Sequence, residues 1–507
     1  MTDPSSRLAA LARSAGVVLF VSLFGQAVAL LAELFVARSL APTVYGELAL
    51  AYTIVLSLGS VALLGVNEGI TRTFSITETE KGRYQVVRAG FAISLVSGLG
   101  SAVFLFITRG MIGEIMGTQA LSRYLIFFLP YIVLLPLSKV TYGTIRAQKR
   151  TVAAVLSKYV FGRLIPILML IPLVELGRET TGAVAYWVGV PTFTLAFGLF
   201  FLNRTLGVAR LFKRLPDRET VEKLWSFSWP LAAGTAVFIF LGNLDIMMIG
   251  YLMPSDSVGY YRAVQPLKQV PMFALGSFTF LFLPLATEYY AERDKVGLNR
   301  LFTASTKWVL LLTIPLVFVF ALFPENVVSV LLGDQYLPGA SALRILIIGL
   351  FLRAVSGLNG DMVKAIDRPR IELYAGIAGL VANFVFNLLL IPMLGINGAA
   401  AATVIGYMVY NGIELAWIHS LTGGIPISKS VLKLIAGMIF FGIAVKTIAP
   451  EVMGLPALVT TGVLFVLAEP VVLVATRSIE PADIEILELI EDRTGVSLTA
   501  IKRLANR

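Results

Sequence analysis

The feature that most constrains this chain is a succession of apolar runs of 18 or more residues along its whole length. Each run is long enough to cross a hydrocarbon core of ~30 Å as one α-helix. The alternating segments of ~10 residues that form a membrane β-barrel are absent from the sequence. Only 14% of the residues are charged and 57% are hydrophobic, whereas about a quarter of the residues in a soluble domain are charged. The sequence therefore predicts an all-α integral membrane protein.

The apolar runs predict fourteen transmembrane helices, and the basic residues orient them. Cytoplasmic loops carry an excess of Lys and Arg. With the N-terminus inside, the predicted inner segments hold 30 of these residues and the outer ones hold six. We therefore expect a multi-pass plasma-membrane protein with both termini in the cytoplasm and a retained first helix. The predicted helices span residues 15–37, 46–66, 88–108, 122–141, 152–174, 181–202, 228–251, 260–286, 303–323, 340–363, 372–391, 396–418, 431–449 and 456–476.

The composition excludes several kinds of chemistry. The chain has no cysteine, so disulfides, thiol catalysis and cysteine metal sites are excluded. A single histidine, His419, cannot build a metal site alone. We interpret the net charge of +10 as basic loops facing anionic lipid and not as a nucleic-acid site. No phosphate loop or clustered catalytic motif is present, so we expect a protein that is not an enzyme, with no catalytic residue, metal or cofactor.

The sequence is internally repeated. "IRAQKR" at 145–150 and "VKAIDR" at 363–368 each join two apolar runs and lie 218 positions apart. Further Pro and Gly landmarks recur in the same order, at offsets of 212 to 220. Each repeat contains six predicted helices and begins inside, which is typical of parallel repeats related by an axis along the membrane normal. The matched pairs are Pro42 with Pro254, Gly46 with Gly259, Pro172 with Pro392, and Gly182 with Gly398.

The repeat divides the chain into predicted parts. We expect two parallel six-helix lobes around a central cavity, plus two accessory helices and a tail in which "PADIEILELIEDR" is an amphipathic helix. The linker is basic and amphipathic, which favours the inner leaflet. The predicted parts are an N-lobe at 1–205, a linker at 206–227, a C-lobe at 228–420, accessory helices at 421–476 and a cytoplasmic tail at 477–507.

Several segments carry a resemblance to a known family. "RSLAPTVYGELALAY", "LLGVNEGITR", "LDIMMIGYLMPSDSVGYYRAVQPL" and "LGDQYLPGASALRILIIGLF" resemble polysaccharide flippases of the multidrug/oligosaccharidyl-lipid/polysaccharide exporter superfamily. The resemblance covers roughly residues 10–475. It implies two lobes and translocation of a lipid-linked sugar from the cytoplasmic to the outer leaflet. The excess of Arg over Lys, the lack of cysteine and the acidic tail are similar to archaeal members.

The expected partners follow from this resemblance. They are a lipid-linked oligosaccharide with a phosphate or pyrophosphate linkage, membrane lipids, and H⁺ or Na⁺ as a coupling ion. We expect no nucleic-acid partner, and we expect a monomer.

Charged side chains within the spans are the first candidate site residues. A charge at a helix centre costs about 2.5–3.5 kcal/mol on insertion scales, so each one needs a function or a partner. The planar guanidinium of Arg binds phosphate bidentately. We interpret Lys158 and Arg344 as snorkelling residues or members of ion pairs. The predicted substrate-binding residues are Arg163, Arg262, Lys268, Arg353 and Gln265.

The spacing of these polar residues predicts faces on two helices. In the helix predicted at 260–286, the polar face is interrupted by Pro266 and Pro271, and broken helices often line substrate paths. The helix predicted at 340–363 carries one continuous polar face, with a period of three to four residues. Its members are Arg353, Ser356, Gly360 and Lys364.

Two carboxylates occupy matching positions in the repeat. Glu33 lies near the end of the first helix, and the local offset of 212 leads to Asp245. A buried carboxylate can take up a proton, or it can bind Na⁺ with oxygens such as that of Asn243. We therefore predict ion coupling at these three residues. Pairing of each carboxylate with an Arg of a neighbouring helix remains an open alternative.

The cluster of Glu68 and Arg72 closes the second helix on the predicted inner side. It is either part of a gate or a simple ion pair between residues four apart.

Three functions remain open at this stage. A lipid-linked saccharide flippase suits the excess of cations within the spans. A cation-coupled drug antiporter of the same superfamily would favour acidic residues there. A membrane glycosyltransferase or ligase would need an acidic motif in a long outer loop, and the longest predicted one holds only Glu325 and Asp334.

Overall fold

The computed structural model describes residues 4–211 and 213–478. These residues form helices joined by short turns, with no strand among them. The prediction of an all-α chain is confirmed. The predicted amphipathic tail helix lies outside the described residues.

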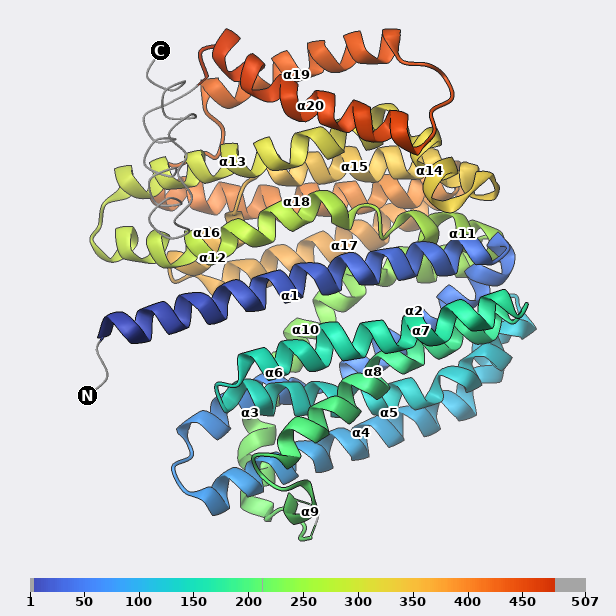
Figure 1. Cartoon of the computed structure of the whole chain (residues 1–507), viewed down its shortest axis with the longest axis vertical. Coiled ribbons are helices and arrows are strands. Elements are labelled where there is room, and N and C mark those ends of the chain that lie inside the picture. Colours follow the sequence, from blue (N-terminus) through green and yellow to red (C-terminus); the bar gives the residue numbers. More distant parts are fainter. Residues whose placement is uncertain (1–3, 212, 479–507) are drawn as a thin grey trace. The chain divides into compact units, whose positions relative to one another are not determined.

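The chain forms two compact units, Met1–Ala263 and Val264–Arg507. Figure 1 shows the first unit from blue to green and the second from green to red. Unit 1 contains α1 (Pro4–Ser39), α2 (Pro42–Ala62), α3 (Val66–Ile76), α4 (Glu80–Ile115), α5 (Gln119–Ala147), α6 (Thr151–Val155), η1 (Leu156–Phe161), α7 (Gly162–Glu175), α8 (Glu179–Asn203), α9 (Val208–Leu211), α10 (Arg218–Leu252) and most of α11 (Ser255–Val264).

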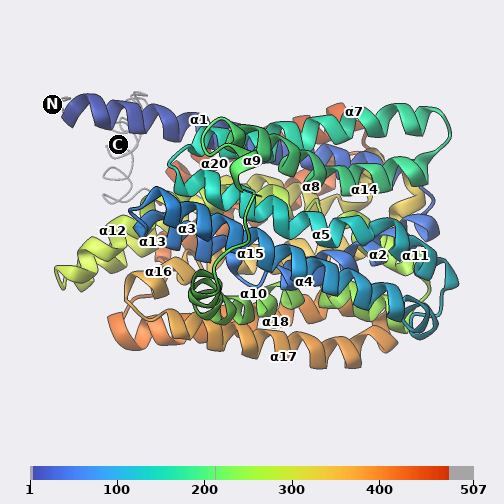
Figure 2. The same cartoon turned by 90° about the horizontal axis from the view of Figure 1, so that it is seen from below.

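Unit 2 is also helical throughout its described part. In Figure 2, α17 and α18 run side by side along one edge of this unit, in orange. The elements of unit 2 are α12 (Gln269–Ala291), α13 (Lys295–Leu322), α14 (Pro324–Leu332), η2 (Asp334–Gly339), α15 (Ala340–Val355), α16 (Asn359–Ala365), α17 (Pro369–Leu394), α18 (Ile396–Thr422), α19 (Lys429–Ile448) and α20 (Leu455–Ala475).

The described residues include eleven helical segments that are long and apolar enough to cross a membrane. These segments match eleven of the predicted spans. The remaining three predicted spans fall on α10, on α11 with α12, and on α18, which are not among the eleven. The count of fourteen therefore stays a prediction.

Two helix pairs, one in each unit, repeat the same local packing. In unit 1, a Cβ on Gly182 of α8 would lie 3.4 Å from the carbonyl oxygen of Leu170 on α7. In unit 2, a Cβ on Gly398 of α18 would lie 2.1 Å from the carbonyl oxygen of Leu390 on α17. In each case the contacted leucine lies two residues before the proline matched in the sequence. Small residues at such crossings let helix backbones approach closely.

A second matched pair of glycines lies at one crossing within unit 1. A Cβ on Gly46 of α2 would lie 1.8 Å from the carbonyl oxygen of Ser255. A Cβ on Gly259 of α11 would lie 2.0 Å from the carbonyl oxygen of Pro42. The contact is reciprocal, as expected where two copies of one motif meet about a twofold axis.

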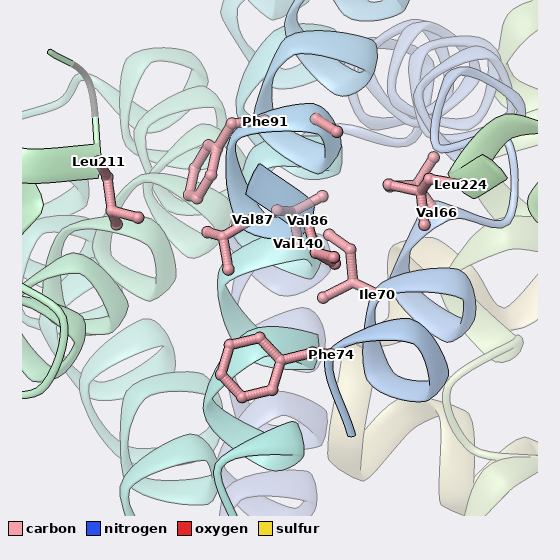
Figure 3. Close-up of a cluster of buried hydrophobic side chains, with 10 residues drawn as sticks. Val66, Ile70, Phe74, Val86, Val87, Phe91, Val140, Leu211 and Leu224 are labelled. Atoms are coloured by element: carbon pink, nitrogen blue, oxygen red, sulfur yellow. The ribbon is translucent and has the colours of Figure 1, made fainter. Parts of the chain in front are cut away.

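The segment after α8 is held against α4 by hydrogen bonds and an apolar cluster. Arg88 donates from Nε to the carbonyl of Leu211 at 2.7 Å, and Tyr84 donates to the carbonyl of Leu206 at 2.5 Å. Figure 3 shows the buried cluster beside these bonds, in which Leu211 and Leu224 join side chains of α3, α4 and α5. These contacts tie the predicted linker to unit 1.

Helix α10 begins ten residues before the predicted span because Asp217 caps it. The Asp217 carboxylate accepts a hydrogen bond from the Thr220 amide at 2.7 Å, which satisfies one free donor of the first turn. Hydrogen bonds from the Thr220 side chain and amide lower the pKa of Asp217. This cap therefore stabilises the helix at neutral pH, and its contribution is lost as the pH falls through the lowered pKa.

The glycine crossing of α2 and α11 gives a first prediction. Gly46→Ala should destabilise the protein, because the added methyl meets backbone and overpacking of this kind costs ~1–3 kcal/mol. Gly100→Ala in α4 is the matched control, because its Cβ meets nothing within 4 Å. Both changes bring the same helix propensity, so their difference in melting temperature isolates the clash. Equal melting temperatures would contradict the close packing at Gly46.

Candidate functional site

A buried carboxylate of α1 forms the centre of the site in unit 1. Glu33 accepts a hydrogen bond from Nε1 of Trp187 on α8, at 2.9 Å. Its second oxygen lies 3.6 Å from Nη2 of Arg262 on α11, which is an ion pair without a direct hydrogen bond. Both charged side chains are only 14% exposed. The predicted alternative for Glu33, pairing with an Arg of another helix, is the arrangement observed.

The carboxylate matched to Glu33 in the repeat lies near the same arginine. Asp245 of α10 is buried and accepts a hydrogen bond of 2.5 Å from the hydroxyl of Tyr261. The charge of Arg262 interacts with both Glu33 and Asp245. The two positions that the sequence relates by the repeat thus share one guanidinium. Asn243, two residues earlier on α10, donates its amide to the carbonyl of Ile239 at 2.8 Å.

Aromatic side chains of three helices surround Glu33. Trp187 stacks on Tyr52 of α2, with ring centroids 4.8 Å apart. Tyr52 in turn meets Tyr131 of α5 edge-on, and the two hydroxyls lie 3.4 Å apart. Tyr45 and Phe128 pack against Trp187 from the remaining sides. The result is an apolar wall with hydroxyl groups on it, a surface that can both pack and hydrogen-bond.

Arg163 of α7 enters the same group. Its Nη1 lies 3.5 Å from the hydroxyl of Tyr186 on α8, a distance at the limit for a hydrogen bond. Its charge also interacts with Tyr52 and Glu33. The structure therefore brings together two predicted substrate residues, Arg163 and Arg262, around the predicted ion-coupling residue Glu33.

Close helix contacts place these groups. A Cβ on Gly162, next to Arg163, would lie 2.2 Å from Oγ1 of Thr194 on α8. A Cβ on Gly25 of α1 would lie 2.5 Å from Cβ of Tyr159 in η1. A larger side chain at either position would move η1 and α7 away from α1 and α8. The glycines thus set the distance at which Arg163 faces the Glu33 group.

The predicted gate residues line a pocket of about 230 Å³ in unit 1, between α3 and α5. Glu68 and Arg72 lie there with Tyr142 and Arg146 of α5. The simple ion pair considered for Glu68 and Arg72 is absent among the described residues. Instead, the amide of Asn67 donates to Glu68 at 2.7 Å, and the guanidinium of Arg72 lies 4.3 Å from the ring centre of Phe227.

The remaining predicted substrate residues belong to unit 2. The guanidinium of Arg353 lies 5.6 Å from the ring centre of Tyr407. Gln265 is buried, and its Nε2 has no hydrogen-bond partner among the described residues. Lys268 and Gln265 lie with Pro266 in the turn between α11 and α12, so the helix is interrupted at Pro266 as predicted, whereas Pro271 lies in the first turn of α12.

The prediction of one continuous polar face on the helix at 340–363 is wrong. Helix α15 ends at Val355 and α16 begins at Asn359. Gly357 between them has φ of +70°, and a Cβ there would meet Oγ1 of Thr306 on α13 at 2.1 Å. Close packing on α13 thus breaks the helix, so Arg353 and Lys364 do not share a helical face.

Two cations within the predicted spans have different surroundings. Arg344 pairs with Glu325 at 3.0 Å, as one interpretation expects. Lys158 forms no ion pair among the described residues and instead donates to the hydroxyl of Tyr159 at 2.9 Å. No group of three or more metal-ligand side chains occurs in the described part of the chain.

Several residues of the site escaped the sequence analysis. No aromatic residue is among the predicted site residues, yet Trp187 and Tyr45 are buried in unit 1 and Tyr52 stacks on Trp187. The spacing of seven between Tyr45 and Tyr52 places both on one face of α2 and could have indicated them. Lys139 lies inside the predicted span 122–141 and within α5, yet it is not among the predicted substrate-binding residues.

Two curated relatives match parts of the chain. The probable low-salt glycan biosynthesis flippase Agl15 of Haloferax volcanii is 22% identical over 45% of this chain and 47% of its own length. The lipid II flippase MurJ of Bacillus subtilis is 22% identical over 78% of this chain and 80% of its own length. The chain spans about half the length of the first curated relatives that it matches.

Two solved structures share the fold. The lipid II flippase MurJ in an inward closed conformation superposes with a TM-score of 0.71 at 13% identity, covering 89% of this chain and 97% of that one. An inward-facing multidrug resistance MATE transporter of the MOP superfamily superposes with a TM-score of 0.65 at 17% identity, covering 80% and 98%. Both likenesses show the fold of a membrane transporter.

The profile of one family, described as polysaccharide biosynthesis protein, matches residues 35–341. This match covers more than half of the chain and includes Arg163, Trp187 and Arg262 of the site, whereas Glu33 lies two residues before the matched range. The chain is a multi-pass membrane protein and belongs to the polysaccharide biosynthesis protein family.

Proposed function

We propose that this protein is a flippase that moves a lipid-linked saccharide from the cytoplasmic to the outer leaflet of the plasma membrane by alternating access. The observation that carries the proposal is the buried group of Arg163, Arg262 and Glu33 within an aromatic wall of unit 1. The flippases among its relatives support the same class. Cytoplasmic termini and the division into two six-helix lobes are part of this proposal.

The linkage of such a substrate explains the cations. A phosphate or pyrophosphate joins the sugar to its lipid, and this anion must cross ~30 Å of hydrocarbon. Guanidinium groups inside the protein can replace the water that hydrates this anion, because they form charge-assisted hydrogen bonds with it. Arg163 and Arg262 take this role in unit 1, and Lys268, Arg353 and Gln265 take it in unit 2. The hydroxyls of Tyr52 and Tyr131 suit a sugar, because each one both donates and accepts.

The carboxylates provide a means of coupling. When Glu33 is ionised, it neutralises Arg262 across 3.6 Å. Protonation of Glu33, or Na⁺ bound by Asp245 and Asn243, would change the positive charge available to a phosphate. The phosphate of the substrate and the carboxylate of Glu33 would then compete for Arg262, so uptake of a cation by the carboxylates would favour binding of the phosphate. Glu68 and Arg72 serve as an inner gate at the pocket of α3 and α5.

A drug antiporter of the same superfamily is the second candidate, favoured by the likeness to the MATE fold. A cationic drug would need an interior with excess negative charge. In unit 1, Glu33 and Asp245 balance Arg262 and Arg163 in charge, and Lys158, whose charge interacts with Arg163, adds a further positive charge. The balance of charge therefore favours an anionic substrate.

The first test measures flipping of a fluorescent polyprenyl-phosphate-linked sugar by the purified protein in liposomes. Arg163→Gln and Arg262→Gln should each slow flipping by about tenfold or more, because each removes a charge-assisted interaction with the anion. Arg344→Gln is the matched control, since Arg344 is paired with Glu325 and 43% exposed. Wild-type rates in both interior variants would remove these arginines from the substrate path. Transport of an organic cation in place of the glycolipid would favour the antiporter.

A second test addresses coupling. Glu33→Gln keeps the hydrogen bond from Trp187 but cannot be ionised, so flipping should lose its dependence on an imposed proton gradient. The same assay with a Na⁺ gradient and Asp245→Asn tests the alternative ion. Glu47→Gln is the control, because Glu47 accepts a hydrogen bond from Thr118 away from Arg262. An undiminished gradient dependence in both the Glu33 and Asp245 variants would refute coupling at this site.

A further inference from the structure

A second group of cations lies in unit 1, beside the site described above. Lys139 and Arg146 are on α5, and Lys158 is in η1. The charge of Lys158 interacts with Arg146 and Arg163, and the charge of Lys139 interacts with Lys158 and Arg163. Lys139 and Lys158 are both partly buried. Like charges this close repel one another, so an arrangement of this kind needs an anion to stabilise it.

The described residues supply little of that negative charge. Among residues 4–211 and 213–478, Lys139, Arg146 and Lys158 form no ion pair. The one carboxylate whose charge interacts with Lys139 is Glu68, which accepts a hydrogen bond from Asn67. Glu33 already faces Arg262. The positive charge of this group therefore exceeds the negative charge around it.

Aromatic rings hold two of the three cations, Arg146 and Lys158, at fixed places. The ring of Tyr142 lies between Arg146 and Lys158, whose charged groups are 5.7 and 5.2 Å from its centre. Lys158 also lies 4.4 Å from the ring centre of Tyr159 and donates to its hydroxyl at 2.9 Å. Such contacts attract a cation without neutralising it. These two cations are therefore ordered while their charge remains available to a ligand.

The backbone around Lys158 is specialised for this placement. Residues 156–161 form a single π-helical turn, a local widening that is frequent at functional sites. Gly25 of α1 lets this turn approach, since its Cβ would lie 2.5 Å from Tyr159. The cluster also has access to space, because Tyr142 and Arg146 line the pocket of about 230 Å³ between α3 and α5.

We propose that Lys139, Arg146 and Lys158 form a second oxyanion subsite, which binds a phosphate or carboxylate group of the transported headgroup apart from the group held by Arg163 and Arg262. This inference rests on the proposed function and extends it. The substrate class is a glycolipid with at least two anionic groups. The second group is either the other phosphate of a pyrophosphate linkage or the carboxylate of an acidic sugar.

Lysine footprinting of the full-length protein in phosphatidylcholine nanodiscs tests the subsite. Acetylation of Lys139, Lys158 and Lys446 is followed by mass spectrometry in the presence of geranylgeranyl pyrophosphate, geranylgeranyl monophosphate or glucuronate. Lys446 of α19 is the internal control, because it contacts only an aromatic ring among the described residues. The pyrophosphate lipid or glucuronate should slow acetylation of Lys139 and Lys158 several-fold and leave Lys446 unchanged. Protection by the pyrophosphate lipid would identify the second phosphate of the linkage as the bound group. Protection by glucuronate would identify the carboxylate of an acidic sugar.

Two variants separate a ligand contact from a structural role. Arg146→Gln should raise the probe concentration that gives half-maximal protection by about tenfold. This is the change expected for the loss of one charge-assisted contact. The same variant should leave acetylation of Lys139 without probe unchanged, which a merely structural role would alter. The rate at Lys158, whose charge interacts with Arg146, is compared only with and without probe in the same variant. Arg262→Gln should retain protection by glucuronate, because the two subsites are distinct.

The outcomes also separate this inference from the proposed function. Equal acetylation with every probe overturns the subsite, and the flipping assay then shows independently whether the flippase proposal stands. Equal protection by phosphatidylglycerol would assign the cations to an ordinary membrane lipid and likewise overturn the subsite. Protection with no flipping by the wild-type protein would keep the oxyanion site and reject the flippase.

Discussion

The cost of placing charge in hydrocarbon governs this structure. A chain with 14% charged residues nevertheless buries an arginine and a glutamate of different helices against each other, at 3.6 Å and with 14% exposure. Such a pair is a poor source of stability, because desolvation offsets much of its attraction. An intramembrane ion pair of this kind is more often functional. The hydrogen bond from Trp187 and the aromatic wall around Glu33 hold the carboxylate where Arg262 can meet either it or an anionic ligand.

The internal repeat explains how the pair arises. The motifs at Gly46 and Gly259 pack reciprocally, which brings the start of α2 against the start of α11. Arg262 lies three residues after Gly259 on α11. Glu33 lies on α1, the helix that precedes Gly46 of α2. Repetition of one helix–loop–helix motif thus delivers a carboxylate from each copy, Glu33 and Asp245, to a single guanidinium. The two copies differ at this point, because only one of them contributes the arginine.

Much of the fold follows from the sequence, and the site follows only in part. Apolar runs locate the helices because each must satisfy its own backbone in lipid, and the matched Pro and Gly residues predict equivalent hairpins such as α7–α8 and α17–α18. The break at Gly357 could not be predicted, since it depends on Thr306 of a distant helix. Charge within spans indicated Arg163, Arg262 and Glu33. Trp187 could not be predicted, because an aromatic ring in lipid and one in the interior look alike in sequence.

The central claim is that the interior of unit 1 is hydrated and positively charged. The natural chain has no cysteine, so a single cysteine can report on this directly. Tyr142→Cys, on the pocket beside Lys158 and Arg146, should react faster with an anionic methanethiosulfonate reagent than with a cationic one. Phe104→Cys, on the exposed apolar face of α4, should react with neither. If the Tyr142 position reacts as slowly as the Phe104 position, or prefers the cationic reagent, the account is contradicted.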